Sequence, residues 1–90
     1  MIFGFNTDVR HGDTLYHVQS EARGGVHILE TQVFVRGRCI AKRTQSYAER
    51  VSQPDFSEAN MQEMLKGQHK LVVDTIRQGR VSELVESPTK

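Results

Sequence analysis

Hydrophobic and polar residues alternate at the start of the chain, and this alternation predicts a β-hairpin. From residue 3 to residue 9, one side of an extended segment carries Phe3, Phe5, Thr7 and Val9. A period of two is typical of a strand with one buried face. The next pair, His11-Gly12, suits a two-residue hairpin loop, because such loops need positive φ and glycine adopts it readily. The resulting register pairs Arg10 with Asp13, Val9 with Thr14, Thr7 with Tyr16 and Phe5 with Val18.

A second pair of strands is predicted after a break at residues 22–25. Residues 26–35 are rich in β-branched side chains, Arg36-Gly37 indicates another tight turn, and residues 38–47 form the return strand. Both faces of this hairpin carry apolar side chains, and a sheet of that kind usually has something packed on each side. The simplest register pairs Val35 with Arg38, Phe34 with Cys39, Val33 with Ile40 and Glu30 with Arg43.

After Pro54 the apolar period changes to that of a helix, which we expect from about residue 57 to residue 78. Asp55 or Ser57 can cap its start, and Asp55 with Glu58 resembles a capping box. Gly79 stands where a helix C-cap glycine is expected. The stripe that should form the core or a dimer contact contains Met61, Met64, Leu65, Gln68, Val72 and Ile76.

Together these elements predict an α+β domain over residues 1–80, a four-stranded antiparallel β-meander followed by one long amphipathic helix on one face. The helix is long enough to lie across the whole sheet. Residues 81–90 should add a short amphipathic turn, with Val81, Leu84 and Val85 on one side, and then a frayed tail.

Composition adds an expectation about assembly and setting. Only 37% of the 90 residues are apolar, which is low for a small domain, so a homodimer is expected as a stabiliser. Cys39 is the single cysteine, which excludes an internal disulfide and favours a reduced compartment. The sequence shows neither a signal-peptide pattern nor an apolar run of membrane-spanning length. Cytoplasmic localisation without a membrane partner is therefore the expectation.

The chain offers little for catalysis or for metal binding. Its four histidines, at positions 11, 17, 27 and 69, form no recognised metal motif, and Cys39 has no second cysteine to join it. Cys39 lies beside Ile40 and Ala41 in a predicted strand, where a buried and inert thiol is the usual finding. We therefore expect no catalytic residue, no metal and no cofactor, and a binding protein rather than an enzyme.

The net charge of the chain is +1, but residues 36–50 carry five cations and one acid, which gives +4 for this segment. By the period of two, Arg38 and Lys42 should share a strand face, and Arg23 can join them across the sheet. Basic side chains with aromatic platforms on an open sheet are what single-stranded nucleic acid needs. The alternative is that Arg43 pairs with Glu30 and the aromatic rings form the core. The candidate nucleic-acid-binding residues are Arg23, Arg36, Arg38, Lys42, Arg43, Tyr16 and Phe34.

The layout resembles the four-strand-and-helix unit of PUR repeats and of the related whirly-type single-stranded nucleic-acid-binding proteins. Residues 14–25 and the basic residues 36–43 are similar in pattern to the corresponding strands, and the resemblance covers residues 3–78. The lysine- and glycine-rich strand signature of the plant whirly proteins is absent. The resemblance implies an intertwined homodimer whose helices pack together and whose sheets face outward.

Two hypotheses follow. The first is a cytoplasmic homodimer that binds single-stranded DNA or RNA on its exposed sheet with little sequence preference. Four neutralised phosphates predict a log–log salt slope of about −2.8. The second is a protein-interaction or adaptor module, also a homodimer, whose sheet face or edge docks another protein. Its contact would be apolar, insensitive to salt and centred on Phe34, Val33 and Ile40.

Overall fold

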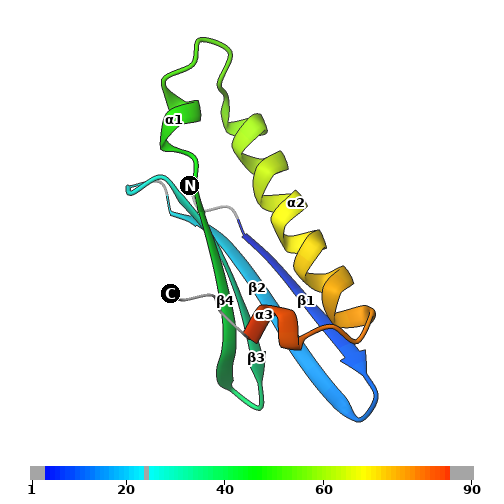
Figure 1. Cartoon of the computed structure of the whole chain (residues 1–90). Helices are drawn as coiled ribbons and strands as arrows, with labels where there is room; N and C mark the ends of the chain where they lie inside the picture. The colour runs from blue at the N-terminus through cyan, green and yellow to red at the C-terminus, as the bar shows by residue number, and fades with distance from the viewer. Residues whose placement is uncertain (1–3, 24, 86–90) are drawn as a thin grey trace.

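The computed structural model describes residues 4–23 and 25–85. Four strands form one antiparallel sheet in the order in which they follow along the chain, and one long helix lies on a single face of that sheet (Figure 1). This confirms the predicted fold class. The strands are β1 (Gly4–His11), β2 (Thr14–Arg23), β3 (Ile28–Val35) and β4 (Arg38–Ser46), and the helices are α1 (Ala48–Val51), α2 (Glu58–Arg77) and α3 (Ser82–Val85).

The first hairpin exists, but its predicted register is wrong by two residues. Its loop is Gly12-Asp13 rather than His11-Gly12, and Gly12 has a φ of 64°. Glycine therefore occupies the first loop position, which is where a type II′ turn requires it. The observed pairs are Val9 with Tyr16, Thr7 with Val18 and Phe5 with Ser20. Because the shift is by two, each side chain stays on its predicted face.

The second hairpin turns at Arg36-Gly37 as predicted, with φ values of 55° and 79° at these two residues. Val35 pairs with Arg38, and Phe34 pairs with Cys39, as expected. Val33 then pairs with Ala41 instead of Ile40, so Ile40 is an extra residue in β4. A β-bulge of this kind reverses the face of every following residue relative to a regular strand.

Helix α2 begins and ends close to the predicted positions. Its N-cap is Ser57, whose hydroxyl accepts from the backbone N–H of Asn60 while the Asn60 side chain accepts from the Ser57 backbone. The capping box therefore uses these two residues rather than Asp55 and Glu58. At the other end, Gly79 has a φ of 74° and its N–H donates to the carbonyl of Ile76. This left-handed glycine ends the helix, as predicted.

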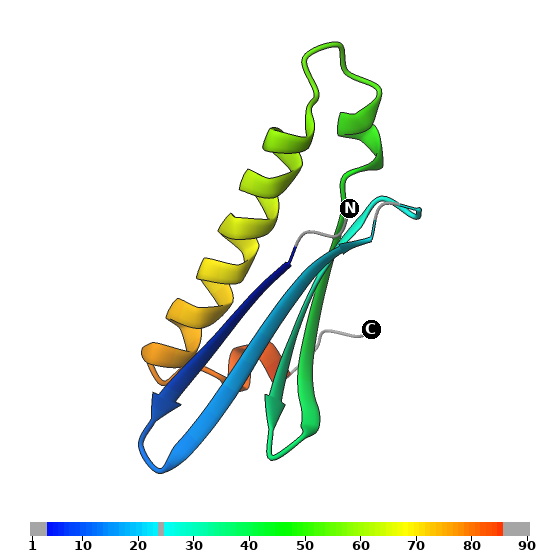
Figure 2. The ribbon, with the colours of Figure 1, turned by 180° about the vertical axis from the view of Figure 1, so that it is seen from behind.

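The core lies between α2 and the first strands of the sheet. α2 packs on β1 and β2 and less extensively on β3, so it does not cover the whole sheet (Figure 2). Five of the six stripe residues are buried there and Met64 is half-buried. The stripe thus packs against the sheet of its own chain. The helix also buries His69, which the predicted stripe omits; the buried residues are Met61, Leu65, Gln68, His69, Val72, Val73 and Ile76.

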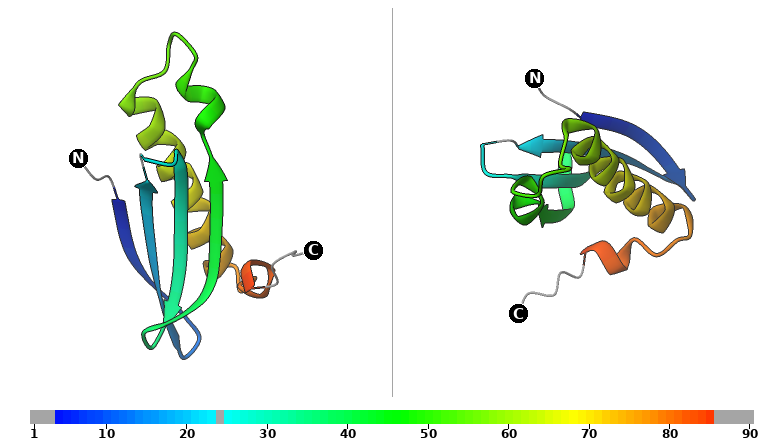
Figure 3. Two further views of the ribbon diagram at one scale, coloured as in Figure 1. Left: turned by 90° about the vertical axis from the view of Figure 1, so that its left-hand side faces the viewer. Right: turned by 90° about the horizontal axis from the view of Figure 1, so that it is seen from above.

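The two short helices lie near β4. α3 packs on β4 and buries Leu84, while Val81 is half-buried against the same core and Val85 is exposed. α1 follows β4 directly and was not predicted from the sequence (Figure 3). Phe3 and the tail at residues 86–90, two places where the sequence made predictions, lie outside the described residues.

Candidate binding edge along β4

The predicted basic cluster does not lie on one surface. We call the side of the sheet toward α2 the helix face and the other side the outer face. Arg38 pairs with Val35 and Arg43 with Thr31, which places both arginines on the helix face. Lys42 pairs with Gln32 and lies on the outer face. The prediction that Arg38 and Lys42 share a face is therefore wrong, because the bulge at Ile40 separates them.

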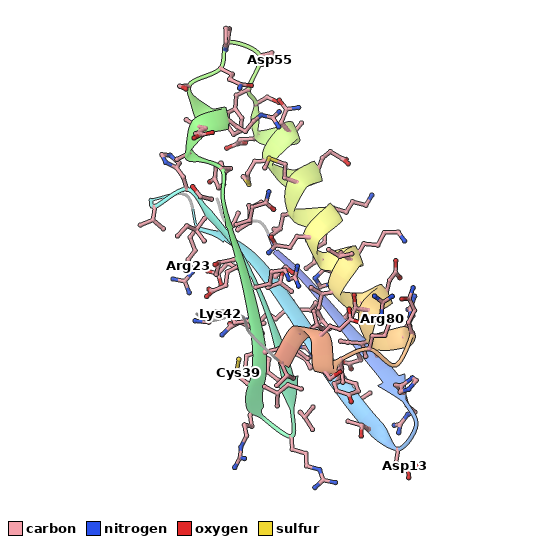
Figure 4. The ribbon with its side chains drawn as sticks, in the orientation of Figure 1. Asp13, Arg23, Cys39, Lys42, Asp55 and Arg80 are labelled. Atoms are coloured by element: carbon pink, nitrogen blue, oxygen red, sulfur yellow. The ribbon has the colours of Figure 1, made fainter. Side chains whose placement is uncertain are left out.

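The outer face carries balanced charge around one buried carboxylate. Glu30 is 8% exposed, and its oxygens lie 2.9 Å from Nε of Arg23 and 3.4 Å from Nζ of Lys42. Arg23 and Lys42 project from the same side of the sheet in Figure 4. The expected pairing of Glu30 with Arg43 is wrong, because Glu30 lies opposite Thr44. Acids and bases occur in equal number on this face, with Asp8, Glu21 and Glu30 against Arg10, Arg23 and Lys42.

The two predicted stacking residues also lie on opposite faces. Tyr16 pairs with Val9 on the helix face and packs against the core. Phe34 is on the outer face, where its ring centroid is 6.3 Å from that of His17. Arg36 lies in the turn between β3 and β4. The structure therefore does not bring the seven candidate residues together as a single platform of cations and rings.

β4 is an edge strand, and its outer backbone groups point away from the sheet. The N–H of Tyr47, directly after β4, donates to the carbonyl of His27 at 2.9 Å. Residues of an antiparallel strand direct their backbone groups alternately toward the neighbouring strand and away from it. Counting back from Tyr47, the N–H and C=O groups of Lys42, Thr44 and Ser46 face the outer edge of the sheet, where no described residue pairs with them. Most side chains of β4 are exposed as well.

The helix face beside β4 is hollowed. One depression lies between β4 and α2, where Gly67 and the 54%-exposed Leu71 form part of its wall. A second lies between β4, α2 and α3, and a third is bordered by α1. In the third, Nε of Arg50 is buried and has no hydrogen-bond partner among the described residues. The hollows and the edge strand thus form one elongated surface, which we call the β4 edge.

A chain of buried polar groups, which was not predicted from the sequence, links α2 to the sheet. Nδ1 of His69 lies 2.6 Å from Oγ of Ser20, and Nε2 lies 2.8 Å from Oγ1 of Thr7. Ser20 also contacts Thr31 at 2.7 Å, and Gln68 donates to Thr31 at 2.9 Å. Two features of the sequence could have indicated this chain. Small hydroxyl residues alternate with valine and leucine on two strands, and the apolar stripe of the helix that faces them contains polar residues.

This arrangement of serine and histidine is structural. Ser20 is 2% exposed and His69 is 7% exposed, so a substrate cannot reach the hydroxyl. Burial lowers the pKa of His69 below its ordinary value, because the charged imidazolium would lose its hydration. The neutral ring suits its two hydroxyl partners, since each hydroxyl can donate or accept.

The remaining candidates for chemistry are Cys39 and the side chains that could bind a metal. Cys39 is exposed on the outer face, so the expectation of a buried thiol is wrong. Among residues 4–23 and 25–85, histidine, cysteine and acidic side chains form no cluster of three or more that could hold a metal. None of the described helices combines the length and apolar character needed to cross a membrane.

No protein-family model, curated protein or solved structure matches this chain.

Proposed function

We propose that this chain is a protein-interaction module that binds an extended acidic segment of another protein as a fifth strand beside β4. The observation that carries this proposal is the open edge of β4, where Lys42, Thr44 and Ser46 present outward backbone groups. An extended segment added to a sheet edge forms main-chain hydrogen bonds with it, and its alternate side chains contact both faces.

The charge of β4 favours an acidic partner. The strand contains Arg38, Lys42 and Arg43 and no acidic residue. The bulge places Arg38 and Arg43 on the helix face, so a bound strand would meet positive charge there, whereas Lys42 on the outer face already contacts Glu30. Arg38 and Arg43 form no salt bridge with any described residue. Glutamate or aspartate side chains on the helix face of the partner strand would therefore find cations within reach.

The same charge disfavours pairing of β4 with a second copy of itself. Two antiparallel β4 strands would bring together two edges that each carry three cations and no acid, and this repulsion between like charges opposes their association. The homodimer expected from the sequence stays a prediction, and the β4 edge is not where we propose it.

Nucleic-acid binding, the first hypothesis from the sequence, has less support in the geometry. A single strand of nucleic acid is bound by contiguous positive charge and by exposed rings. Here Tyr16 packs against the core, Phe34 lies on the other face, and the acids of the outer face offset its bases. A nucleic acid would also leave the outward backbone groups of β4 unused.

The test uses the whole chain and a fluorescently labelled peptide of about ten residues made of threonine and glutamate, a length that matches one strand. Fluorescence anisotropy should show binding that weakens when lysine replaces glutamate in the peptide. On binding, hydrogen exchange should slow at the amides of Lys42, Thr44 and Ser46, because these N–H groups acquire acceptors. Binding without that protection would contradict strand addition.

A proline on each edge strand provides the matched comparison. Thr44→Pro removes one outward N–H of β4 without removing a bond to β3, so the fold should persist while peptide affinity falls about tenfold or more. His11 and Thr14 close the first hairpin, so Asn6 directs its N–H to the free edge of β1. Asn6→Pro should leave peptide binding unchanged. Tight binding of single-stranded DNA, with no peptide binding, would overturn the proposal in favour of nucleic acid.

A further inference from the structure

One hollow of the β4 edge has the size and the lining of a pocket for a single side chain. It has a volume of about 290 Å³ and lies between β4, α2 and α3. Four apolar side chains contribute to its lining, Val33 and Ala41 from the sheet, Val72 from α2 and Leu84 from α3. Small-molecule sites usually measure ~300–1,000 Å³, so this volume suits a single large side chain better than a cofactor.

The charge at this hollow is positive. Arg43 lines it and forms no salt bridge with a described residue. Glu83 also lines it, but both of its carboxylate oxygens accept hydrogen bonds from Arg80, at 2.9 and 3.1 Å. Pairing with Arg80 lowers the pKa of Glu83 and offsets its charge. What remains is a hollow lined on one side by the four apolar side chains and on the other by Thr31, Thr44 and the guanidinium of Arg43.

We infer that this hollow is the anchor subsite of the β4 edge, which takes one apolar side chain of the added strand while Arg43 binds a carboxylate beside it. This inference rests on the proposed function. The hollow borders Ala41, Arg43 and Thr44 of β4, so a side chain on the helix face of a fifth strand lies next to it. The carboxylate belongs to an acidic residue two positions away along the added strand, which shares that face.

α3 makes this subsite specific. Leu84 is 8% exposed and closes one wall, and α3 is attached to α2 through the turn at Gly79. Without α3 the helix face of β4 would be open at this point. The size of the accepted side chain is therefore set by the distance between α3 and Ala41, and a leucine or methionine suits it better than alanine.

The test compares labelled threonine peptides of about ten residues, one strand in length. The first carries a central leucine with glutamate two positions away, and the second has alanine in place of leucine. A third has glutamine in place of glutamate, and a further pair ends in leucine with a free or an amidated C-terminus. The leucine–glutamate peptide should bind about tenfold or more tightly than its alanine counterpart. Replacement of the glutamate by glutamine should weaken binding by a similar factor. A loss of binding on amidation, with no loss on this replacement, would overturn the acidic residue as the source of the carboxylate.

Two variants of the protein locate the subsite. Ala41→Leu fills the hollow from a half-buried position, so it should abolish the preference for leucine over alanine. Arg43→Gln should abolish the preference for the carboxylate, and it leaves the bond from Gln68 to the Arg43 carbonyl in place. Thermal unfolding of both variants checks that the fold is retained.

The outcomes separate this inference from the proposed function. If Thr44→Pro weakens binding but Ala41→Leu leaves the leucine preference intact, strand addition stands and the anchor subsite is wrong. If neither variant changes binding, both are wrong. Equal affinity of leucine and alanine peptides for the unmodified protein also overturns the subsite.

Discussion

The two halves of the helix face of the sheet differ in what they bury. β1 and β2 lie beneath α2, where Val9 is 3% exposed and Val18 is fully buried. β4 lies beyond the helix and presents Arg43 and Gln45 on the same face, both exposed. The covered half supplies the apolar burial that stabilises a small domain. The open half contributes little to that burial, which leaves its residues free to serve binding.

The polar chain through His69 belongs to the covered half and has a different consequence. Apolar packing alone allows a helix to slide, whereas hydrogen bonds to Thr7, Ser20 and Thr31 fix α2 in one position on the sheet. A fixed helix also fixes the wall of the hollows beside β4. The covered half therefore positions the open half.

The largest expected effect tests whether burial is confined to the covered half. Leu65→Ala removes a fully buried side chain and should lower the free energy of unfolding by about 2–5 kcal/mol. Leu71→Ala makes the same change on the side of α2 that faces β4, where the side chain is 54% exposed, and should cost less than about 0.5 kcal/mol. Urea unfolding measures both. Equal losses would show that the open half is packed after all.

The next effect tests the polar chain. Ser20→Ala leaves Nδ1 of His69 without its partner in a buried site and should cost about 1–3 kcal/mol. Ser46→Ala makes the same substitution on β4, where the hydroxyl is exposed and accepts only from the backbone of Ala48. That variant should be nearly neutral. If Ser20→Ala leaves the free energy of unfolding unchanged in the same urea titration, the chain of buried polar groups does not position α2.

The pH dependence of the free energy of unfolding should report on the same site. Because burial lowers the pKa of His69 in the folded state, the unfolded chain binds more protons as the pH falls through about 6.5. Stability attributable to His69 is complete above that pH and decreases below it, by less than about 1.4 kcal/mol per pH unit. His69→Gln should flatten this dependence. If wild type and variant lose stability in parallel between about pH 7.5 and 5.5, His69 does not titrate as proposed.

The sequence predicts those parts of the fold that depend on local periodicity and on turn residues. Each of these signals depends only on a few neighbouring residues, and the structure confirms the elements that they predict. They are the period of two in the strands, the Arg36-Gly37 turn, the helix stripe and Gly79. The register of the first hairpin failed because Gly12 suits either loop position, and only packing across the strands decides between them.

The candidate site was less predictable because it depends on one extra residue. The bulge at Ile40 has no local signature, since Ile40 can pair regularly or be bulged with the same neighbours. Its effect is nevertheless to move Arg43 from the outer face to the helix face. The buried position of His69 likewise depends on hydroxyls that are distant in the sequence, at Thr7 and Ser20.

The smallest expected effect concerns the charges of β4. Lys42 is 53% exposed at its side chain, so Lys42→Ala should cost only about 0–1 kcal/mol, and Arg23→Ala should behave similarly. Each single variant leaves Glu30 with one cation. The double variant leaves this buried carboxylate without either, so its loss should exceed the sum of the two single losses. Additive losses in urea unfolding would show that Glu30 is hydrated, and both cations would then be free to contact a bound strand.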